Sequence, residues 1–200
     1  MKYKDIHVYS HQRSGSHYFA ALISLNFYNE QDYRKRYKNH PIGNKVRGRI
    51  DKNSDILFAY IFRNFNDTAK SMFKMRDRFG LTVDDYDVFL NTTYKDMWSS
   101  DVKFSIKINY FGEEKHVDKV STYFKKINQT PREFWQAHKR FWTKMNKTRG
   151  NIIIVNYDDL INDFEKEIRR VGEKIGITKK QIINIDEKIG WIPVSFGEAK

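Results

Sequence analysis

The stretch that decides the fold is residues 6–25, I-H-V-Y-S-H-Q-R-S-G-S-H-Y-F-A-A-L-I-S-L. Its first part alternates Ile6, Val8 and Ser10 with histidine and tyrosine, which is the pattern of a short β-strand. Its last part, residues 19–25, is mostly apolar and predicts a buried helix. A turn with a single glycine, residues 12–17, separates the strand from the helix.

The composition of this turn suits an anion. Ser14, Gly15 and Ser16 are small enough to leave backbone N–H groups accessible, the helix start adds partial positive charge, and Arg13 adds a full one. The turn is neither a Walker A loop nor a G-x-G-x-x-G fingerprint, and Ser16 has an alternative role as a helix cap. From these residues alone, phosphate binding and a purely structural turn are equal alternatives.

Length and composition predict one folded domain over residues 1–200. The chain is 40% hydrophobic and 16% aromatic, which is enough for a sizeable core. It has no cysteine, so disulfides and thiolate metal sites are excluded. No apolar run reaches the length of a membrane span, and no signal sequence follows the first residues. We therefore expect a cytoplasmic protein without a membrane span, and no cluster of ligands suggests a metal.

The charge balance favours an anionic partner. Lysine and arginine number 37 against 25 acidic residues, a net charge of +12. The run 33–38, Y-R-K-R-Y-K, mixes cations with aromatic rings as single-strand nucleic-acid binders do, although such a run is more often a solvated face. A non-catalytic protein that binds nucleic acid or another polyanion is therefore the alternative to an enzyme.

Two more strands are predicted, at residues 55–62 and 151–157. Helices are expected at 67–79 with Asn66 or Asp67 as cap, from Thr130 along an aromatic stripe to Met145, from about Asp158 to Gly176, and at 179–188. Residues 81–129 are interpreted as an insertion that lines the acceptor side, with an exposed strand or hairpin arm at 103–111. The insertion offers aromatic side chains for stacking on a sugar or aromatic ring, namely Tyr86, Tyr94, Trp98 and Tyr110.

Strands that alternate with helices predict an α/β fold of three α/β/α layers with a mostly parallel central sheet. Ligands in such folds bind beyond the carboxyl ends of the strands. Arg13, Arg63 and Tyr157 each follow one of the three predicted strands, so we expect them at one edge of the sheet.

Several stretches of the chain resemble the sulfotransferases that use 3′-phosphoadenosine 5′-phosphosulfate (PAPS), which have a P-loop-like fold. The turn Q-R-S-G-S-H-Y is similar to their 5′-phosphosulfate loop, P-K-S-G-T-T-W. Residues 60–71 resemble their 3′-phosphate motif, Y-x-x-R-N-x-x-D-x-x-x-S. Residues 135–142 resemble W-x-x-H-x-x-x-W, and residues 157–160 resemble the Y-E-D-L corner.

The resemblance implies the donor site. Its nucleotide-binding residues would be Arg13, Ser14, Gly15, Ser16, His17, Tyr18, Arg63, Ser71 and Tyr157. In this scheme PAPS is the co-substrate and the bisphosphate PAP the product, no metal takes part, and Arg13 stabilises the departing phosphate. The acceptor would be a hydroxyl or amine, with a sugar or polysaccharide as one candidate, and nucleic acid is not expected as a partner.

A base must take the acceptor's proton. Residues 38–41, K-N-H-P, resemble the family's K-T-H-L-P segment and make His40 the first candidate. Its unperturbed pKa of about 6.5 leaves a histidine largely neutral at pH 7. A plain surface histidine is the alternative reading. Other members use a glutamate after the first helix, which keeps Glu30 and Asp32 as candidates.

Overall fold

The computed structural model describes residues 2–28, 35–36, 38, 50–51, 53–99, 105–110, 113–118 and 122–185. The chain falls into two units, each treated by itself below. The first combines Met1–Asn64 with Ala137–Trp191, and the second combines Phe65–Gln136 with Ile192–Lys200. The single domain over residues 1–200, with 81–129 as an insertion, stays a prediction.

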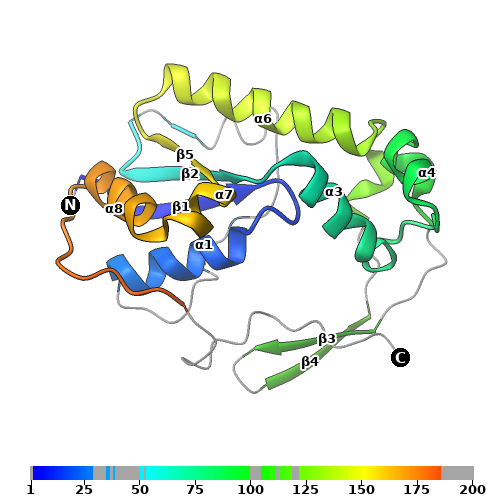
Figure 1. Ribbon diagram of the computed structural model, residues 1–200, viewed down its shortest axis with the longest axis horizontal. Coiled ribbons are helices and arrows are strands. Elements are labelled where there is room, and N and C mark those ends of the chain that lie inside the picture. Colours follow the sequence, from blue (N-terminus) through cyan, green and yellow to red (C-terminus); the bar gives the residue numbers. More distant parts are fainter. Residues whose placement is uncertain are drawn as a thin grey trace. The chain divides into compact units, whose positions relative to one another are not determined.

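The sheet of the first unit contains three parallel strands in the order β1 (Asp5–Ser10), β2 (Ile56–Phe62) and β5 (Ile152–Asn156) (Figure 1). The predicted α/β architecture is therefore confirmed. β2 is the central strand, as its continuous apolar sequence predicts for a strand covered on both faces.

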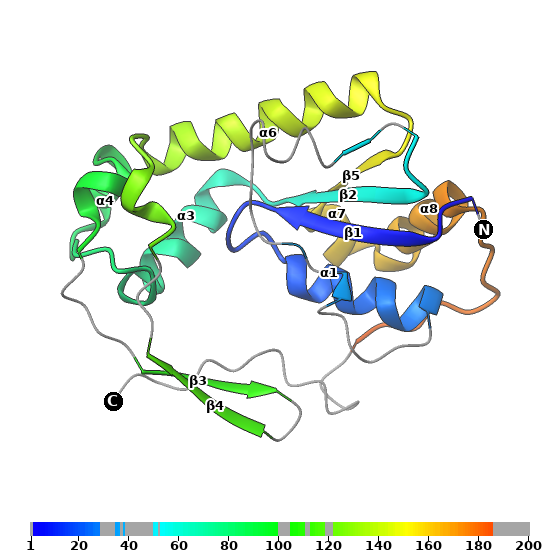
Figure 2. The same cartoon turned by 180° about the vertical axis from the view of Figure 1, so that it is seen from behind.

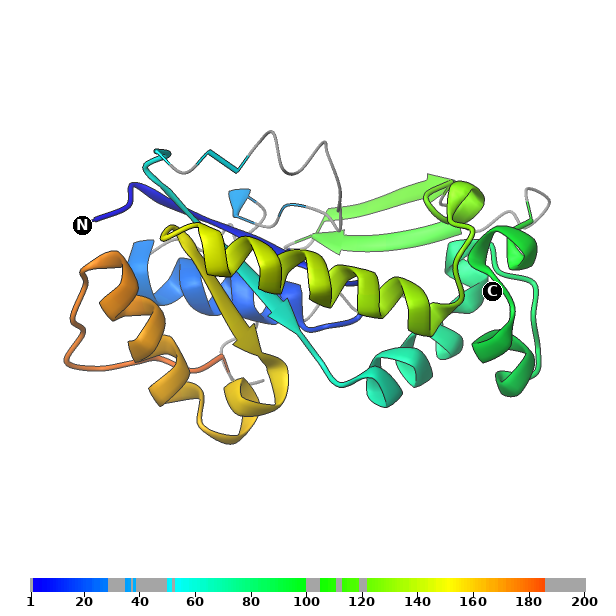
Figure 3. The same cartoon turned by 90° about the horizontal axis from the view of Figure 1, so that it is seen from above.

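Successive residues of these strands point to opposite faces of the sheet, and each face carries its own core. One core joins Ile6, Leu57 and Ile153 to α1 (Ser16–Ile23) and α8 (Phe164–Ile175). The other joins Phe58 and Tyr60 to the later part of α6 (Pro131–Thr148). In the first unit the sheet thus lies between two helical layers, and α6 is seen over it from above (Figure 3).

The outer edge of β1 contacts two described residues of the 33–38 run. Val8 N donates to the carbonyl of Arg36 at 2.8 Å, and Lys38 N donates to the carbonyl of Val8 at 3.0 Å. The Arg36 side chain is buried, with its guanidinium 3.5 Å from the ring centre of Tyr28 and 3.4 Å from Asp5. Arg36 is therefore a structural cation and does not present its charge to a nucleic acid.

Helix α1 continues into a π-helical turn, η1 (Ser24–Tyr28). After β2 the chain enters α3 (Phe65–Lys74) and a 3₁₀ turn, η3 (Arg76–Phe79). Asn66 and Asp67 lie inside α3, so the prediction that either caps it is wrong. The helix begins at Phe65, which is buried and packs against Arg132 and Trp135. Burial of this ring favours the earlier start.

The helix predicted from about Asp158 to Gly176 is two helices, α7 (Tyr157–Asn162) and α8. The break lies at Asp163, whose carboxylate accepts the backbone N–H of Lys166 and so caps α8. Gly176 ends α8 in the left-handed conformation, as predicted.

The helix predicted at residues 179–188 is absent from its described part, residues 179–185. Arg169 donates to the carbonyls of Lys179 and Lys180, and Asn26 pairs with the backbone of Ile183. These side chains occupy backbone groups that a helix would need for its own hydrogen bonds, so an irregular segment replaces it. The rest of that prediction, residues 186–188, lies outside the described residues.

The second unit has an aromatic core that the sequence pattern does not show. It includes α4 (Tyr86–Asn91), α5 (Tyr94–Met97) and a 3₁₀ turn, η4 (Phe124–Lys126). Tyr94 is fully buried, 4.4 Å from Phe124 and 5.7 Å from Phe134 between ring centres. The expectation that Tyr94 is available to stack on an acceptor is therefore wrong, because its ring belongs to this core.

The strand or hairpin arm predicted at 103–111 appears as β3 (Ser105–Tyr110), which pairs antiparallel with β4 (Glu113–Asp118) (Figure 2). The helix start at Thr130 is confirmed. Thr130 N donates to the Glu133 carboxylate at 2.8 Å, and Glu133 N donates back to Thr130 Oγ1 at 3.4 Å. No helix in the described part of the chain is long and apolar enough to cross a bilayer.

Two buried histidines meet in the first unit. His11 and His138 are 1% and 0% exposed, and their ring centres lie 5.2 Å apart. His11 Nδ1 donates to the carbonyl of Gln12 at 2.8 Å. Burial lowers the pKa of His11 from 6.5 to about 4. The folded protein therefore keeps this ring neutral over a range in which the unfolded chain protonates it.

We predict that the free energy of unfolding decreases as the pH falls from about 6.5 to about 4, by up to about 1.4 kcal/mol per pH unit. The unfolded state binds the proton over this window while folded His11 does not, so acidification favours unfolding. Urea unfolding at several pH values between about 7 and 5, above most carboxylate titrations, measures this slope. His11→Asn should reduce this slope, whereas equal slopes in both proteins would contradict the prediction.

Candidate functional site

Three chain corners meet at the carboxyl edge of the sheet in the first unit. The loop 11–15 follows β1, Arg63 and Asn64 follow β2, and Tyr157 follows β5. The strands end nearly level, because Ser10 pairs with Ile61 and Phe62 pairs with Asn156. This is the edge at which ligands bind in open α/β sheets.

The loop after β1 holds two residues in the left-handed region of backbone conformation. Arg13 has φ 61° and Gly15 has φ 83°. The conformation is easy for glycine and unusual for arginine, and such departures occur often at binding sites. Gly15 precedes α1 as its N-cap without a side-chain cap bond, so Ser16 is the first helical residue and not the cap.

The corners after β1 and after β2 both contact the ring of Tyr157, which follows β5. A Cβ atom built on Gly15 would lie 2.2 Å from Cδ2 of the Tyr157 ring. On the same tyrosine, the Arg63 guanidinium lies 4.8 Å from the ring centre. Tyr157 is the first residue of α7 and half-buried. Its ring therefore contacts both the loop after β1 and the arginine after β2.

A polar contact ties the same corners together. Asn64 Nδ2 donates to Asp158 Oδ2 at 3.3 Å. The backbone N–H of Asp158 is in turn bound by Asn156 Oδ1 at 3.2 Å, which caps α7. Sequence reasoning assigned no role to this pair, since only the strand order brings residues 64 and 158 side by side.

Tyr18 lies on the first turn of α1 and donates its hydroxyl to Asn184 Oδ1 at 2.8 Å. Burial, followed by the proximity of Tyr157, raises the pKa of the Tyr18 hydroxyl. Tyr18 and Tyr157 are both partly buried and pack against the same core. Asn184 was not a predicted site residue, because its segment was expected to be helical.

His17 is the second residue of α1, and its side chain is exposed to solvent. Partial loss of hydration, followed by the positive charge of Arg13, lowers the pKa of His17 from 6.5 to about 4. Either cause leaves the ring neutral at pH 7. His17 can therefore offer a hydrogen bond to an anion but no charge.

Four predicted residues remain, namely Ser71, His40, Glu30 and Asp32. Ser71 lies half-buried on α3, in the second unit. His40, Glu30 and Asp32 lie outside the described residues. Their roles stay predictions.

Solved structures resemble this fold. One is the crystal structure of the mouse sulfotransferase SULT7A1 complexed with PAP, with a TM-score of 0.53 and 18% identity over 93% of this chain and 62% of that one. Another is a crystal structure of retinol dehydratase in complex with androsterone and inactive cofactor PAP, with a TM-score of 0.40 and 12% identity over 92% of this chain and 61% of that one. This chain thus spans less than two thirds of either protein.

No curated protein sequence matches the chain. The sulfotransferase domain family, in contrast, matches residues 51–190, which include the Arg63 corner, α6 and the Tyr157 corner. The match covers well over half of the chain, and the mouse structure shares its α/β architecture. The chain belongs to the sulfotransferase domain family.

Proposed function

We propose that this protein transfers a sulfuryl group from PAPS to a hydroxyl or amine acceptor. The observation that carries the proposal is that the Arg13 loop and Arg63 both lie against the ring of Tyr157. Two cationic corners on one aromatic ring suit a nucleotide with a phosphate group at each end. Family membership supports the proposal, and the mouse sulfotransferase structure named above contains PAP.

The loop after β1 fits the 5′-phosphosulfate end. Ser14 is fully buried, and within the described ranges its Oγ has no hydrogen-bond partner. A buried hydroxyl left without a partner destabilises a protein by about 1–3 kcal/mol, and an anionic oxygen can satisfy it. The left-handed Arg13 and Gly15 and the start of α1 give the loop the form of an anion-binding nest.

Arg63 fits the 3′-phosphate end. A guanidinium offers a planar fork that binds phosphate oxygens through two parallel hydrogen bonds. The resemblance adds Ser71, eight residues later, as a second donor. Tyr18 and Tyr157 supply the aromatic surface for the base between the two phosphates.

The proposed chemistry requires positioning and charge stabilisation more than covalent catalysis. Sulfuryl transfer resembles phosphoryl transfer, with a loose in-line transition state and a phosphate as leaving group. Arg13 stabilises the negative charge that develops on the bridging oxygen, helped by the N–H groups of residues 14–17. Arginine keeps its proton at neutral pH, so this role is electrostatic. His40 takes the proton from the acceptor, with Glu30 and Asp32 as the alternative bases.

We propose an acidic carbohydrate as the acceptor. A net charge of +12 attracts polyanions, and Tyr86 and Trp98, neither of them fully buried, remain candidates for stacking on a sugar ring. One observation weakens the alternative, a nucleic-acid-binding protein without catalysis. Arg36, which belongs to the basic run that suggested it, is buried against Tyr28.

We predict that PAP raises the melting temperature of the protein, whereas ATP with magnesium does not. Only PAP offers the 3′-phosphate that Arg63 is proposed to hold, and a ligand that binds the folded state stabilises it by mass action. Differential scanning fluorimetry measures the shift, with heparin as a polyanion control. Stabilisation by heparin alone would favour the binding protein over the enzyme.

Arg63→Ala tests the proposed 3′-phosphate contact at the corner after β2. Arg140→Ala is its matched control, because it removes an exposed arginine of α6. Arg63→Ala should weaken PAP binding by about 2–3 kcal/mol in calorimetry, because a charged hydrogen-bonded contact to phosphate is lost. Arg140→Ala should leave it near the wild-type value. Equal affinities for all three proteins would remove Arg63 from the site.

Gly15→Ala should destabilise the protein by about 1–3 kcal/mol and weaken PAP binding, because the new methyl group meets the Tyr157 ring and the backbone is left-handed. Urea unfolding and calorimetry measure the two effects. Gly150→Ala is the control, since nothing lies within 4 Å of a Cβ built there. A Gly15→Ala protein with normal stability and affinity would contradict the close approach.

His40→Ala should abolish sulfuryl transfer and leave PAP affinity unchanged, because the base contacts the acceptor and not the nucleotide. Transfer from labelled PAPS to a panel of acidic carbohydrates measures the first property, and calorimetry the second. Full turnover in the variant would assign the base to Glu30 or Asp32, whose alanine variants are the next comparison.

A further inference from the structure

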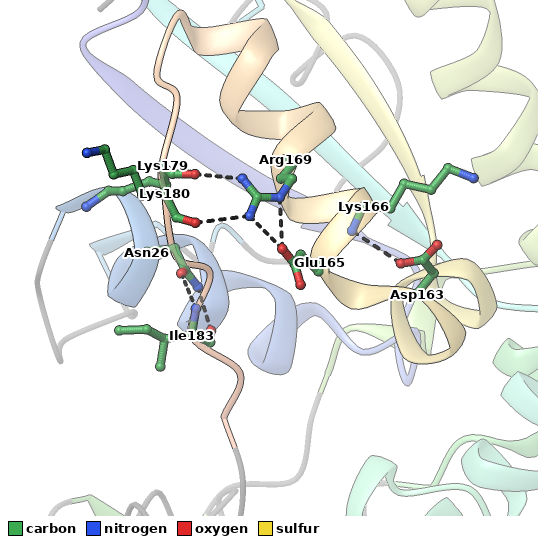
Figure 4. Close-up of polar contacts among 8 residues, drawn as sticks. All are labelled: Asn26, Asp163, Glu165, Lys166, Arg169, Lys179, Lys180 and Ile183. Carbon is green, nitrogen blue, oxygen red and sulfur yellow. Dashed lines mark hydrogen bonds and ion pairs between the residues drawn. The ribbon is translucent and has the colours of Figure 1, made fainter.

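Residues 177–185 form an irregular segment that follows α8 and runs beside α1 and η1, and we call it the strap (Figure 4). Ile177, Ile182 and Ile185 are partly buried and pack against the core beneath. Lys179, Lys180 and most of the other side chains of the strap are exposed. The strap is therefore held by a few specific contacts and not by deep burial.

Asn26 makes the central contact. Its Nδ2 donates to the carbonyl of Ile183 at 2.8 Å, and its Oδ1 accepts the backbone N–H of the same residue at 2.8 Å. Asn26 is only 3% exposed and also donates to the carbonyl of Leu22 at 3.0 Å. The side-chain amide thus satisfies both backbone groups of one strap residue, as a neighbouring β-strand would.

Arg169 fixes the earlier part of the strap. Its guanidinium donates to the carbonyl of Lys179 at 2.6 Å and to that of Lys180 at 3.3 Å (Figure 4). Glu165, one turn earlier on α8, accepts from Arg169 Nε at 3.0 Å and orients it. Both lysine carbonyls are therefore engaged by a side chain that is itself held in place.

The strap ends at the candidate site. Asn184, next to the clamped Ile183, accepts the Tyr18 hydroxyl at 2.8 Å, and its Oδ1 also accepts the backbone N–H of Ile185 at 2.8 Å. Tyr18 lies three residues after Gly15. A chain of contacts thus leads from Asn26 through the strap to the tyrosine on the first turn of α1.

We propose that the strap holds the ring of Tyr18 in the orientation that stacks on the nucleotide base, with Asn26 and Asn184 as its positioning residues. Neither asparagine needs to touch the ligand. Fixing the ring before binding removes part of the entropy loss on association, which strengthens binding. This inference rests on the function proposed above.

The experiment combines PAP calorimetry with limited trypsin digestion, in which mass spectrometry follows cleavage after Lys179 and Lys180. Asn184→Ala removes the contact to Tyr18 at an exposed position. Asn26→Asp is nearly isosteric, keeps the acceptor for Ile183 N and loses both donated hydrogen bonds. Asn91→Ala is the control, because Asn91 Nδ2 also donates to the carbonyl four residues earlier on its helix, α4, which belongs to the second unit.

Asn26→Asp should speed cleavage after the two lysines and weaken PAP binding about tenfold, equivalent to about 1.4 kcal/mol. Asn184→Ala should weaken PAP binding with little change in cleavage, since Asn26 still binds the backbone of Ile183. Tyr18→Phe should match Asn184→Ala, and the double variant should be no weaker than either single one, because both remove the same hydrogen bond.

Unchanged PAP affinity in Asn184→Ala and Asn26→Asp would overturn the inference, and so would additive losses in the double variant. Faster cleavage of Asn26→Asp with normal PAP affinity would overturn it too, because the strap would then be only structural. A wild-type protein that does not bind PAP would instead overturn the proposed function and the inference with it. Since the wild type is measured first, the two failures are distinguishable.

Discussion

The site depends on the close approach between the backbone of Gly15 and the ring of Tyr157. These residues belong to corners separated by most of the chain, and they meet because β1 and β5 flank β2 in one parallel sheet. The missing side chain of Gly15 lets the ring lie against the loop, and the same ring faces the guanidinium of Arg63. The loop, the arginine and the tyrosine are thus mutually positioned, and none can shift far without disturbing the others.

The parts of this arrangement that the sequence predicts are those in which local pattern and global fold agree. Alternation in residues 6–10 and continuous apolar runs in the other two strands indicate the sheet, since strand residues must fill a core on each face. From the sheet alone, Arg13, Arg63 and Tyr157 are expected at one edge. The shared tyrosine and the link from Asn64 to Asp158 depend on side-chain packing, which no period in the sequence reveals.

The errors have a common physical cause, which is that tertiary contacts override what the local sequence indicates. The strap has a helix-like sequence, yet Asn26 and Arg169 bind its backbone and hold it in an irregular form. Tyr94 reads as an exposed aromatic ring in a polar region, yet it lies at the centre of the second unit's core. The same holds for charge, since Arg36 contributes to the basic surplus while its side chain is buried.

The buried hydroxyl of Ser14 has a consequence for the rate at which the protein is degraded in a cell. A loop that keeps a hydroxyl without a partner within the described structure leaves the ligand-free protein less stable than its core alone would allow. A small loss of stability increases the share of unfolded molecules that proteases remove. If the proposed nucleotide satisfies this hydroxyl, cells starved of sulfate would lose the protein by degradation as well as the nucleotide. The abundance of the protein would then follow sulfur supply without a dedicated regulator.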